Sequence, residues 1–188
     1  MLNAVLEHPL LRQQVIPMTV HTYEALGQMG LVEERTELIR GFVLPKMSKS
    51  PRHYIVTQRL AEWLRLYLND QFCIRQEQPI ACKDSEPEPD IAVVAGTIED
   101  FAHAHPTTAT LIVEVSISTL ERDREKAAIY AEAGVAEYWL VNPEDSWVEQ
   151  FSAPQAGIYT QCVKLDKSAV LTCLSFPHIQ VNLSDLLA

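Results

Sequence analysis

The feature that most constrains the fold is a nearly continuous apolar run over residues 110–115 that contains one carboxylate, Glu114. An unbroken apolar run of this length is typical of a strand buried on both faces of a sheet. Because successive side chains of a strand point to opposite faces, Glu114 shares its face with Ile112 and Ser116. An ionised carboxylate in such a place costs several kcal/mol unless a cation compensates it. The run therefore predicts a metal ion or a lysine beside Glu114.

A second carboxylate, Asp90, opens the preceding strand-like segment, directly after Pro89. Proline suits the first position of a strand because it has no N–H group to donate to a neighbour. If this strand and the 110–115 strand are neighbours, Asp90 and Glu114 converge. Two carboxylates, the carbonyl group of Val115 and several waters would then form a hard oxygen site suited to Mg²⁺.

A candidate for the compensating charge is Lys126, in a charged stretch that follows the strand. Residues 118–121, Ser-Thr-Leu-Glu, have the spacing of a capping box and predict a helix over 122–133. Lys126 and Tyr130 share one face of that helix, because residues three or four positions apart are neighbours. The short connection after the strand can fold this face back against Glu114. Lys126 would then be placed to orient a water molecule for attack on a phosphodiester bond.

Composition places the chain among globular proteins with a sizeable core. Its 188 residues, of which 47% are hydrophobic, predict one domain over 1–188. The first twenty residues lack the hydrophobic region of a signal peptide, and no stretch approaches the roughly 18 apolar residues of a membrane helix. A cytoplasmic protein without membrane contact is therefore expected. Four cysteines without zinc-ligand spacing are expected to be reduced: Cys73, Cys82, Cys162 and Cys173.

The net charge of −10 argues against general attraction to nucleic acid, but the charge is unevenly distributed. Between Arg40 and Arg75, seven basic residues stand against two acidic ones. Lys46, Lys49 and Arg52 form the loop part of this basic region. A solvated surface and a role in contacting nucleic-acid phosphates are both open for these three residues.

The remaining pattern alternates helices with strands, which predicts an α/β domain with a mixed central β-sheet flanked by helices. Helices are predicted over 19–30 and 51–68, where apolar residues recur at helical spacing. Ile55, Leu60 and Leu64 are predicted on the core-facing side of the second helix. Strands or hairpin arms are predicted over 37–44, 72–83, 90–95, 137–141, 147–151, 158–165, 170–174 and 179–181, and a closing helical turn near 183–187.

Taken in order, these residues resemble the PD-(D/E)XK nuclease superfamily, in particular a large bacterial restriction-endonuclease-like group of unknown specificity. That group has a pattern similar to EVS-x-ST-x-x-x-D-x-x-K-x-x-x-Y-x-x-x-GV-x-EYW, which this chain carries from Glu114 to Trp139. The resemblance is strongest over 19–151. It implies a restriction-endonuclease-like core and a Mg²⁺- or Mn²⁺-dependent endonuclease that acts on DNA. The upstream residues that share the pattern are Glu37-Leu38-Ile39 with Gly41, and Met47-Ser48 with Pro51 and His53.

The resemblance also assigns roles to individual residues. It implies that Asp90 and Glu114 are metal ligands and that Glu37 is an additional acidic residue of the catalytic set. Lys126 replaces the lysine that usually stands two positions after the glutamate, where this chain has Ser116. A homodimer is expected on separate grounds, because cleavage of both DNA strands needs two active sites and two-fold dimers are the commonest assembly.

Other interpretations are open at this stage. A degenerate member that keeps the fold as a module for nucleic-acid binding or dimerisation would fit the acidic surplus and the displaced lysine. A phosphodiesterase that acts on RNA or nucleotides would use the same site. Asp90 and Glu114 could belong to a structural ion-pair network, and Lys126 could be a solvated helix residue. Glu37 could be a surface strand residue, and His53 is expected to pack at the helix start rather than to act as a base.

Overall fold

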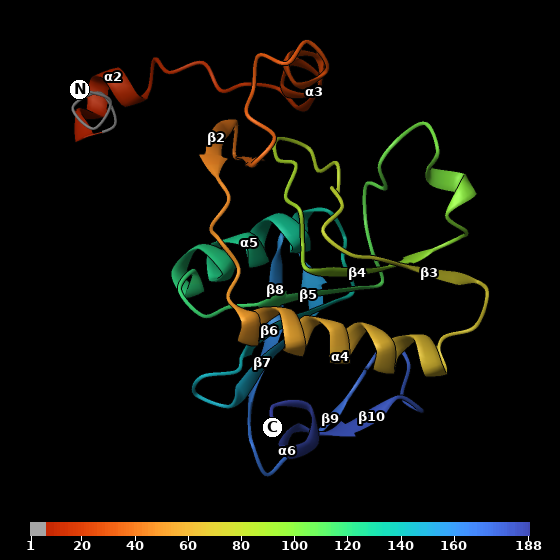
Figure 1. Cartoon of the computed structure of the whole chain (residues 1–188). Helices are drawn as coiled ribbons and strands as arrows, with labels where there is room; N and C mark the ends of the chain where they lie inside the picture. The colour runs from red at the N-terminus through yellow and green to blue at the C-terminus, as the bar shows by residue number, and fades with distance from the viewer. Residues whose placement is uncertain (1–6) are drawn as a thin grey trace.

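A computed structural model of the chain describes residues 7–188, apart from the side chain of Arg12. Its centre is a six-stranded sheet with the strand order β3-β4-β5-β6-β7-β8 (Figure 1). β5 and β6 run parallel, whereas all other neighbours in this sheet are antiparallel. The mixed sheet confirms the predicted α/β class. Its strands are β3 (Phe72–Arg75), β4 (Ile91–Ala95), β5 (Leu111–Val115), β6 (Glu137–Asn142), β7 (Trp147–Gln155) and β8 (Ile158–Asp166).

Two helices, α4 (Pro51–Tyr67) and α5 (Leu120–Glu132), pack on the two faces of this sheet (Figure 1). Val113 of β5 belongs to the buried cluster that includes α4, whereas Ile112 belongs to a second cluster with Tyr130 of α5. The predicted division of this strand into two buried faces is confirmed. Full burial of one such aliphatic side chain contributes about 1.5–3 kcal/mol, so β5 is strongly fixed in place. No helix among the described residues is long and apolar enough to cross a membrane.

The N-terminal part contributes two helices and a hairpin, α2 (Pro9–Arg12), α3 (Val20–Gln28), β1 (Thr36–Ile39) and β2 (Phe42–Pro45). Thr19 caps α3, because its side chain accepts a hydrogen bond from the backbone N–H of Thr22 at 3.1 Å. The hairpin turns at Arg40 and Gly41, which have φ values of 51° and 78°. Positive φ at both central residues matches the right-handed twist of the two strands.

The C-terminal part adds a two-stranded sheet, β9 (Val170–Thr172) and β10 (Gln180–Asn182), and a short helix, α6 (Leu183–Leu186). Elsewhere in the chain, a 3₁₀ turn, η1 (Glu99–Phe101), connects β4 to β5. Glu137 at the start of β6 holds the C-terminal part against the main sheet and is 1% exposed. Its Oε1 accepts hydrogen bonds from Trp139 Nε1 at 2.6 Å, Gln150 Nε2 at 2.7 Å and the backbone N–H of Leu174 at 3.1 Å. Its Oε2 accepts one from the backbone N–H of Ser175 at 2.9 Å. This buried carboxylate is therefore satisfied by neutral donors.

Three expectations about local structure were wrong. α5 begins at Leu120 rather than at residue 122, with Thr119 at its N-cap position, so that Leu120 and Glu121 already belong to the first helical turn. β3 ends at Arg75 instead of continuing to 83, because the following segment leaves the sheet and pairs with the 84–90 segment, as in the bond from Ile80 N–H to the Pro87 carbonyl at 3.0 Å.

The core-facing side of α4 is the third correction. Ile55 is 48% exposed, whereas Val56 is 1% exposed and packs in the core with Leu60 and Leu64. The buried face of α4 also contains the polar residues His53 and Thr57. Apolar spacing alone predicts Ile55 on the core-facing side, because it takes no account of buried polar residues such as His53 and Thr57.

Candidate active site

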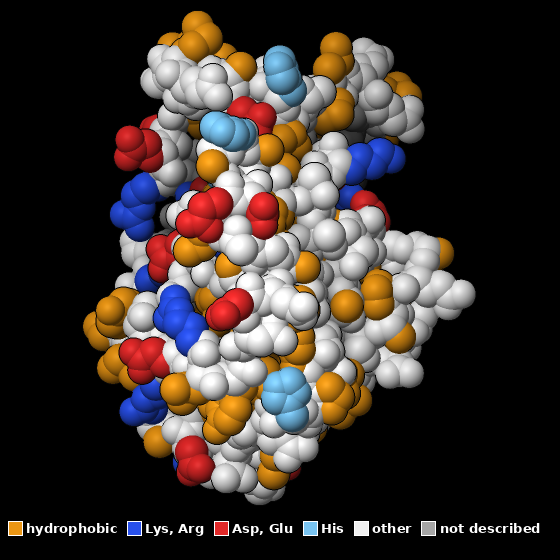
Figure 2. All heavy atoms as spheres, turned by 90° about the vertical axis from the view of Figure 1, so that its right-hand side faces the viewer, with side chains coloured by type: hydrophobic (Ala, Val, Ile, Leu, Met, Phe, Trp, Pro, Cys, Tyr) orange, Lys and Arg blue, Asp and Glu red, His pale blue; other side chains and the backbone are white. Residues whose placement is uncertain are grey.

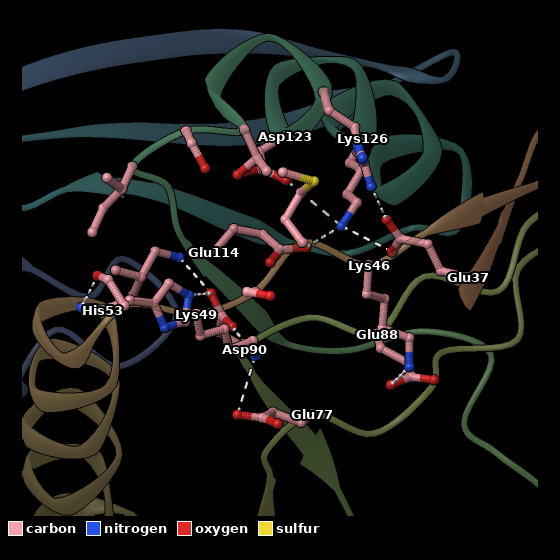
Figure 3. Close-up of a pocket in the computed structure, with 18 of the residues that line it drawn as sticks. Glu37, Lys46, Lys49, His53, Glu77, Glu88, Asp90, Glu114, Asp123 and Lys126 are labelled. Atoms are coloured by element: carbon pink, nitrogen blue, oxygen red, sulfur yellow. Dashed lines mark hydrogen bonds and ion pairs between the residues drawn. The ribbon is translucent and has the colours of Figure 1, made fainter. Parts of the chain in front are cut away.

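The predicted acidic residues and Lys126 line one cavity of about 390 Å³ (Figure 3). The cavity lies where the N-terminal end of β4, the C-terminal end of β5, the first turn of α4 and the first two turns of α5 meet. Residues from β1 and the 46–50 loop complete its wall. Its charged and histidine lining residues are Arg35, Glu37, Lys46, Lys49, His53, Glu77, Glu88, Asp90, Glu114, Arg122, Asp123 and Lys126.

Asp90 immediately precedes β4 and is 3% exposed. Its Oδ2 accepts hydrogen bonds from the backbone N–H of Val115 at 2.7 Å and from His53 Nε2 at 3.0 Å. Its Oδ1 accepts one from Lys49 Nζ at 2.7 Å. Burial alone would raise the pKa of Asp90, but His53 and Lys49 together outweigh burial and lower it. Asp90 is thus held as an ionised carboxylate at the end of β5.

Glu114 on β5 points to the side of the sheet that carries α5, as its position beside Ile112 predicts. Its Oε1 accepts hydrogen bonds from Lys126 Nζ at 3.0 Å and from the Tyr130 hydroxyl at 2.8 Å. Burial raises the pKa of Glu114 to about 8, because the attraction of Lys126 offsets it only in part and Asp123 and other carboxylates repel the charge. Among the described residues, Oε2 of Glu114 has no hydrogen-bond partner, although the residue lines the cavity.

Lys126 projects from α5 and is 4% exposed. Besides Glu114, its Nζ lies 3.1 Å from Glu37 Oε2 and 3.6 Å from Asp123 Oδ1. Burial alone would lower the pKa of Lys126, but Glu114, Glu37 and Asp123 outweigh burial and raise it. Lys126 is therefore a buried ammonium group surrounded by three carboxyl groups, not the solvated helix residue of the alternative interpretation.

Glu37 is likewise buried, at 3% exposed, and is not a surface residue of β1. It joins β1 to α5 through Lys126 and through Arg122, whose NH1 donates to Glu37 Oε1 at 3.2 Å. The same Arg122 nitrogen donates to the carbonyl of Pro45 at 3.0 Å, at the end of β2. The N-terminal hairpin is thus bound to the helix that carries Lys126.

The cavity is lined by oxygen donors that could bind a metal ion. Asp90 and Glu114 supply carboxylate oxygens to one cavity, and Val115, whose carbonyl is the third expected donor, lines it too. These are hard oxygen donors of the type that Mg²⁺ and Mn²⁺ prefer. In residues 7–188, no group of three or more His, Cys, Asp or Glu side chains is arranged to hold a metal ion, so the donor set has two side chains. The residues fit a hard divalent cation, with Lys49 as a competitor for Asp90 Oδ1.

The three predicted phosphate-contacting residues do not share one place. Lys46 and Lys49 line the cavity, where Lys46 pairs with Glu88, and Lys49 pairs with Asp90 and, at 3.1 Å, with Glu77. Arg52 lies outside the cavity lining, and its NH2 donates to the carbonyl groups of residues 143 and 187 at 3.1 and 2.8 Å. Arg52 therefore connects α4 to the C-terminal part and is not grouped with the two lysines.

His53 takes part in the site, whereas its sequence position predicts only packing at the start of the helix. It is 8% exposed, and its Nε2 must carry a proton because its partner, the Asp90 carboxylate, can only accept. Its other ring nitrogen lies 3.4 Å from the Thr57 hydroxyl, and its backbone N–H donates to the Ser50 side chain that caps α4. The available signal was the helical spacing of His53 with Leu60 and Leu64, which places this polar residue on the buried face of α4.

The mixed sheet, with Asp90 and Glu114 at the adjoining ends of β4 and β5 and with Lys126 beside Glu114 on α5, defines a protein of the restriction-endonuclease-like fold. The sequence matches the Uma2 family, described as "Putative restriction endonuclease", over residues 22–184. The chain belongs to this family, and membership supports a nuclease function.

A solved structure has the same fold, the crystal structure of a "putative nuclease belonging to DUF820" from Anabaena variabilis. It aligns with a TM-score of 0.76 at 17% sequence identity and covers 91% of this chain and 98% of that chain. At this identity the likeness bears on the fold alone. A comparison with curated proteins gave no match.

Proposed function

We propose that this protein is a Mg²⁺- or Mn²⁺-dependent endonuclease that hydrolyses phosphodiester bonds in DNA. The observation that carries the proposal is the convergence of Asp90, Glu114 and Lys126 on one cavity, with Lys126 in direct contact with Glu114 at 3.0 Å. A structural ion pair would need only one acid for one base. Here three carboxyl groups surround one ammonium group, and a further cation in the cavity would favour the ionised form of Glu114.

In this proposal Asp90 and Glu114, with the Val115 carbonyl, would hold the metal ion. The ion would acidify a water molecule and neutralise the charge that develops on the phosphate. Asp90 is already ionised and oriented by His53 and the backbone N–H of Val115. Glu114 can offer Oε2 to the ion, because Lys126 and Tyr130 both donate to its other oxygen, Oε1.

Lys126 supplies the positive charge that the PD-(D/E)XK pattern usually places two positions after the glutamate. Ser116 is fully buried at that position, and its hydroxyl lies 3.3 Å from the Thr119 hydroxyl, so it offers neither charge nor reach. Lys126 remains protonated in its acidic surroundings and is therefore suited to orient water and stabilise negative charge, but not to act as a base.

Lys46 and Lys49 are proposed to contact the DNA backbone at the entrance of the cavity. Each is paired with a carboxylate and can exchange that partner for a phosphate group. A homodimer is part of the proposal because cleavage of both strands requires two sites. Exclusively monomeric protein at micromolar concentration in analytical ultracentrifugation would argue against the dimer.

The second candidate is a catalytically inactive member that binds nucleic acid. It is favoured by the two ion pairs Lys49–Asp90 and Lys126–Glu114, since each lysine occupies an oxygen of a proposed metal ligand. A cleavage experiment distinguishes the two candidates, since only the active endonuclease would hydrolyse nucleic acid.

The experiment is cleavage of supercoiled plasmid, DNA oligonucleotides and RNA with Mg²⁺ or Mn²⁺. Wild type and the control E62Q, on the exposed side of α4, should nick DNA, whereas D90N and K126M should lose at least about 100-fold in rate. Cleavage of RNA alone would replace the proposed substrate. No cleavage of any substrate, or equal cleavage by D90N, would reject the enzymatic proposal.

A further inference from the structure

The segment 84–90 places an acidic residue at every second position, and three of these four acids have a basic partner. Asp84 pairs with Arg40, Glu88 with Lys46, and Asp90 with Lys49. The fourth acid, Glu86, has no Lys, Arg or His nitrogen within 4 Å among residues 7–188, the Arg12 side chain excepted. Glu86 is therefore an exception within its own segment.

Glu86 is also deeply buried, at 6% exposed. Its backbone is fixed by a 2.6 Å hydrogen bond from its N–H to the Leu38 carbonyl on β1. Its Oε2 is a buried oxygen without a hydrogen-bond donor among the described residues. A buried carboxylate normally has a cation or several donors, because its desolvation is costly.

The side chain lines a second cavity, of about 440 Å³, which is separate from the proposed active site. This cavity lies between α3 and the 101–105 segment that follows η1, and we call it the α3 cavity. The side of the molecule that faces the viewer in Figure 2 carries this segment, and acidic and histidine side chains gather in its upper part (Figure 2). No Lys or Arg is among the described lining residues, which include Tyr23, Glu24, Glu33, Glu34, Glu86, Phe101, His103 and His105.

Charge in the α3 cavity is thus strongly one-sided. Burial, followed by the neighbouring Glu24, raises the pKa of Glu86 to about 7. His105 does not supply the missing charge, because burial and the adjacent Arg75 lower its pKa. A cation that enters the cavity would favour the ionised form of Glu86 and would supply the partner that its Oε2 lacks.

The form of the cavity points to an organic cation rather than to a metal ion. No group of three metal-binding side chains converges here or elsewhere in the described part of the chain. The cavity is also much larger than a single ion, and two of its lining residues, Tyr23 and Phe101, are aromatic. Aromatic rings together with carboxylates are well suited to ammonium and guanidinium groups.

We propose that the α3 cavity binds an organic ammonium or guanidinium group, with Glu86 and Glu24 as the anionic anchors. The same chemistry can come from a free polyamine or from a basic side chain of a peptide. Binding here would join α3 to the 84–90 segment that leads to Asp90, but the site is independent of the proposed nuclease reaction.

The test is isothermal titration calorimetry of the full chain at pH 8, with spermidine in one arm and the peptide Gly-Arg-Gly in the other. We expect saturable binding of at least one probe, at least tenfold weaker binding by E86Q and E24Q, and unchanged binding by E62Q. D90N should also bind as wild type does, because Asp90 lies outside the cavity. Spermidine alone would identify a polyamine site, and the peptide alone a site for a basic side chain.

A second measurement guards against misfolding of the variants. Thermal melts should show E86Q and E24Q as stable as wild type without the probe, and the probe should raise the melting temperature of wild type more than that of E86Q. Absence of binding by both probes, binding equal in wild type and E86Q, or Mn²⁺ binding that is lost in E86Q would each overturn the proposal. In the last case the cavity would be a metal site, and in the first two Glu86 would be a buried acid without a ligand.

Discussion

Glu114 and Glu137 are two buried glutamates on adjacent strands, and their surroundings differ in kind. Glu137 is held by neutral donors on both oxygens, whereas Glu114 receives a lysine and a tyrosine on one oxygen and leaves the other without a partner. Neutral donors hold the Glu137 carboxylate in place and occupy both of its oxygens, so that neither oxygen is open to a metal ion. The comparison indicates that the sheet contains one carboxylate that stabilises the fold and one that is available for a ligand, and four substitutions can test this distinction.

The largest effect is expected at Lys126. K126M would leave Glu37, Glu114 and Asp123 close together without the ammonium group, so unfolding should become easier by about 4 kcal/mol. The exposed control K83M should change stability by less than about 0.5 kcal/mol. Urea denaturation of the metal-free proteins gives the measurement. A K126M protein as stable as wild type would show that the charge cluster is not formed.

The next effect concerns Glu137. E137Q turns one oxygen into an amide that faces backbone donors at residues 174 and 175, so we expect a loss of about 3 kcal/mol. Metal affinity and any nuclease activity should be kept at temperatures where the variant is folded. If E137Q abolished metal binding without unfolding the chain, the assignment of Glu137 to the fold alone would be contradicted.

The pH dependence of stability should distinguish Glu114 in the metal-free protein. Its pKa is about 8 in the folded state, well above the ordinary value of 4.5, so folding favours the protonated form. This contribution is complete below about pH 4.5 and is lost as the pH rises through 8. Relative to E114Q, the stability of wild type should fall steadily from pH 5 to about pH 8 and should change little above that pH. Parallel pH profiles for the two proteins in urea titrations would exclude a protonated Glu114.

The smallest effect is expected at His53. H53A removes a donor that orients Asp90, so Mn²⁺ affinity should fall about tenfold, as for other residues behind a metal ligand. H53Q keeps an N–H group that can reach Asp90 and should recover part of the loss. Equal Mn²⁺ affinity in all three proteins, measured by calorimetry, would reduce His53 to the packing role that its sequence position suggested.

Much of the site could be predicted because its parts are local. The apolar run of β5 fixes the side to which Glu114 points, and the helical spacing of α5 places Lys126 and Tyr130 on that side. The Asp90 position followed from a strand boundary marked by proline. Each of these predictions depends only on local spacing: side chains alternate between the two faces of a strand, and residues three or four positions apart share one face of a helix.

Other contacts could not be predicted, since they depend on how distant segments meet. Lys49 and Arg52 are three positions apart in one basic region, yet Lys49 binds Asp90, whereas Arg52 binds carbonyl groups near the C-terminal part. His53 and Glu137 look like ordinary polar residues until their partners are known. The partner of a charged side chain is set by the tertiary fold, which local spacing does not specify.

The most direct test of the nuclease site is a Mn²⁺ titration of the DNA-free protein, followed by electron paramagnetic resonance. We expect wild type and E137Q to bind Mn²⁺, and D90N and E114Q to bind it at least about 100-fold more weakly, since each lacks one of two carboxylate ligands. Binding that is unchanged in D90N and E114Q, or no binding by wild type at millimolar Mn²⁺, would contradict a metal site between Asp90 and Glu114.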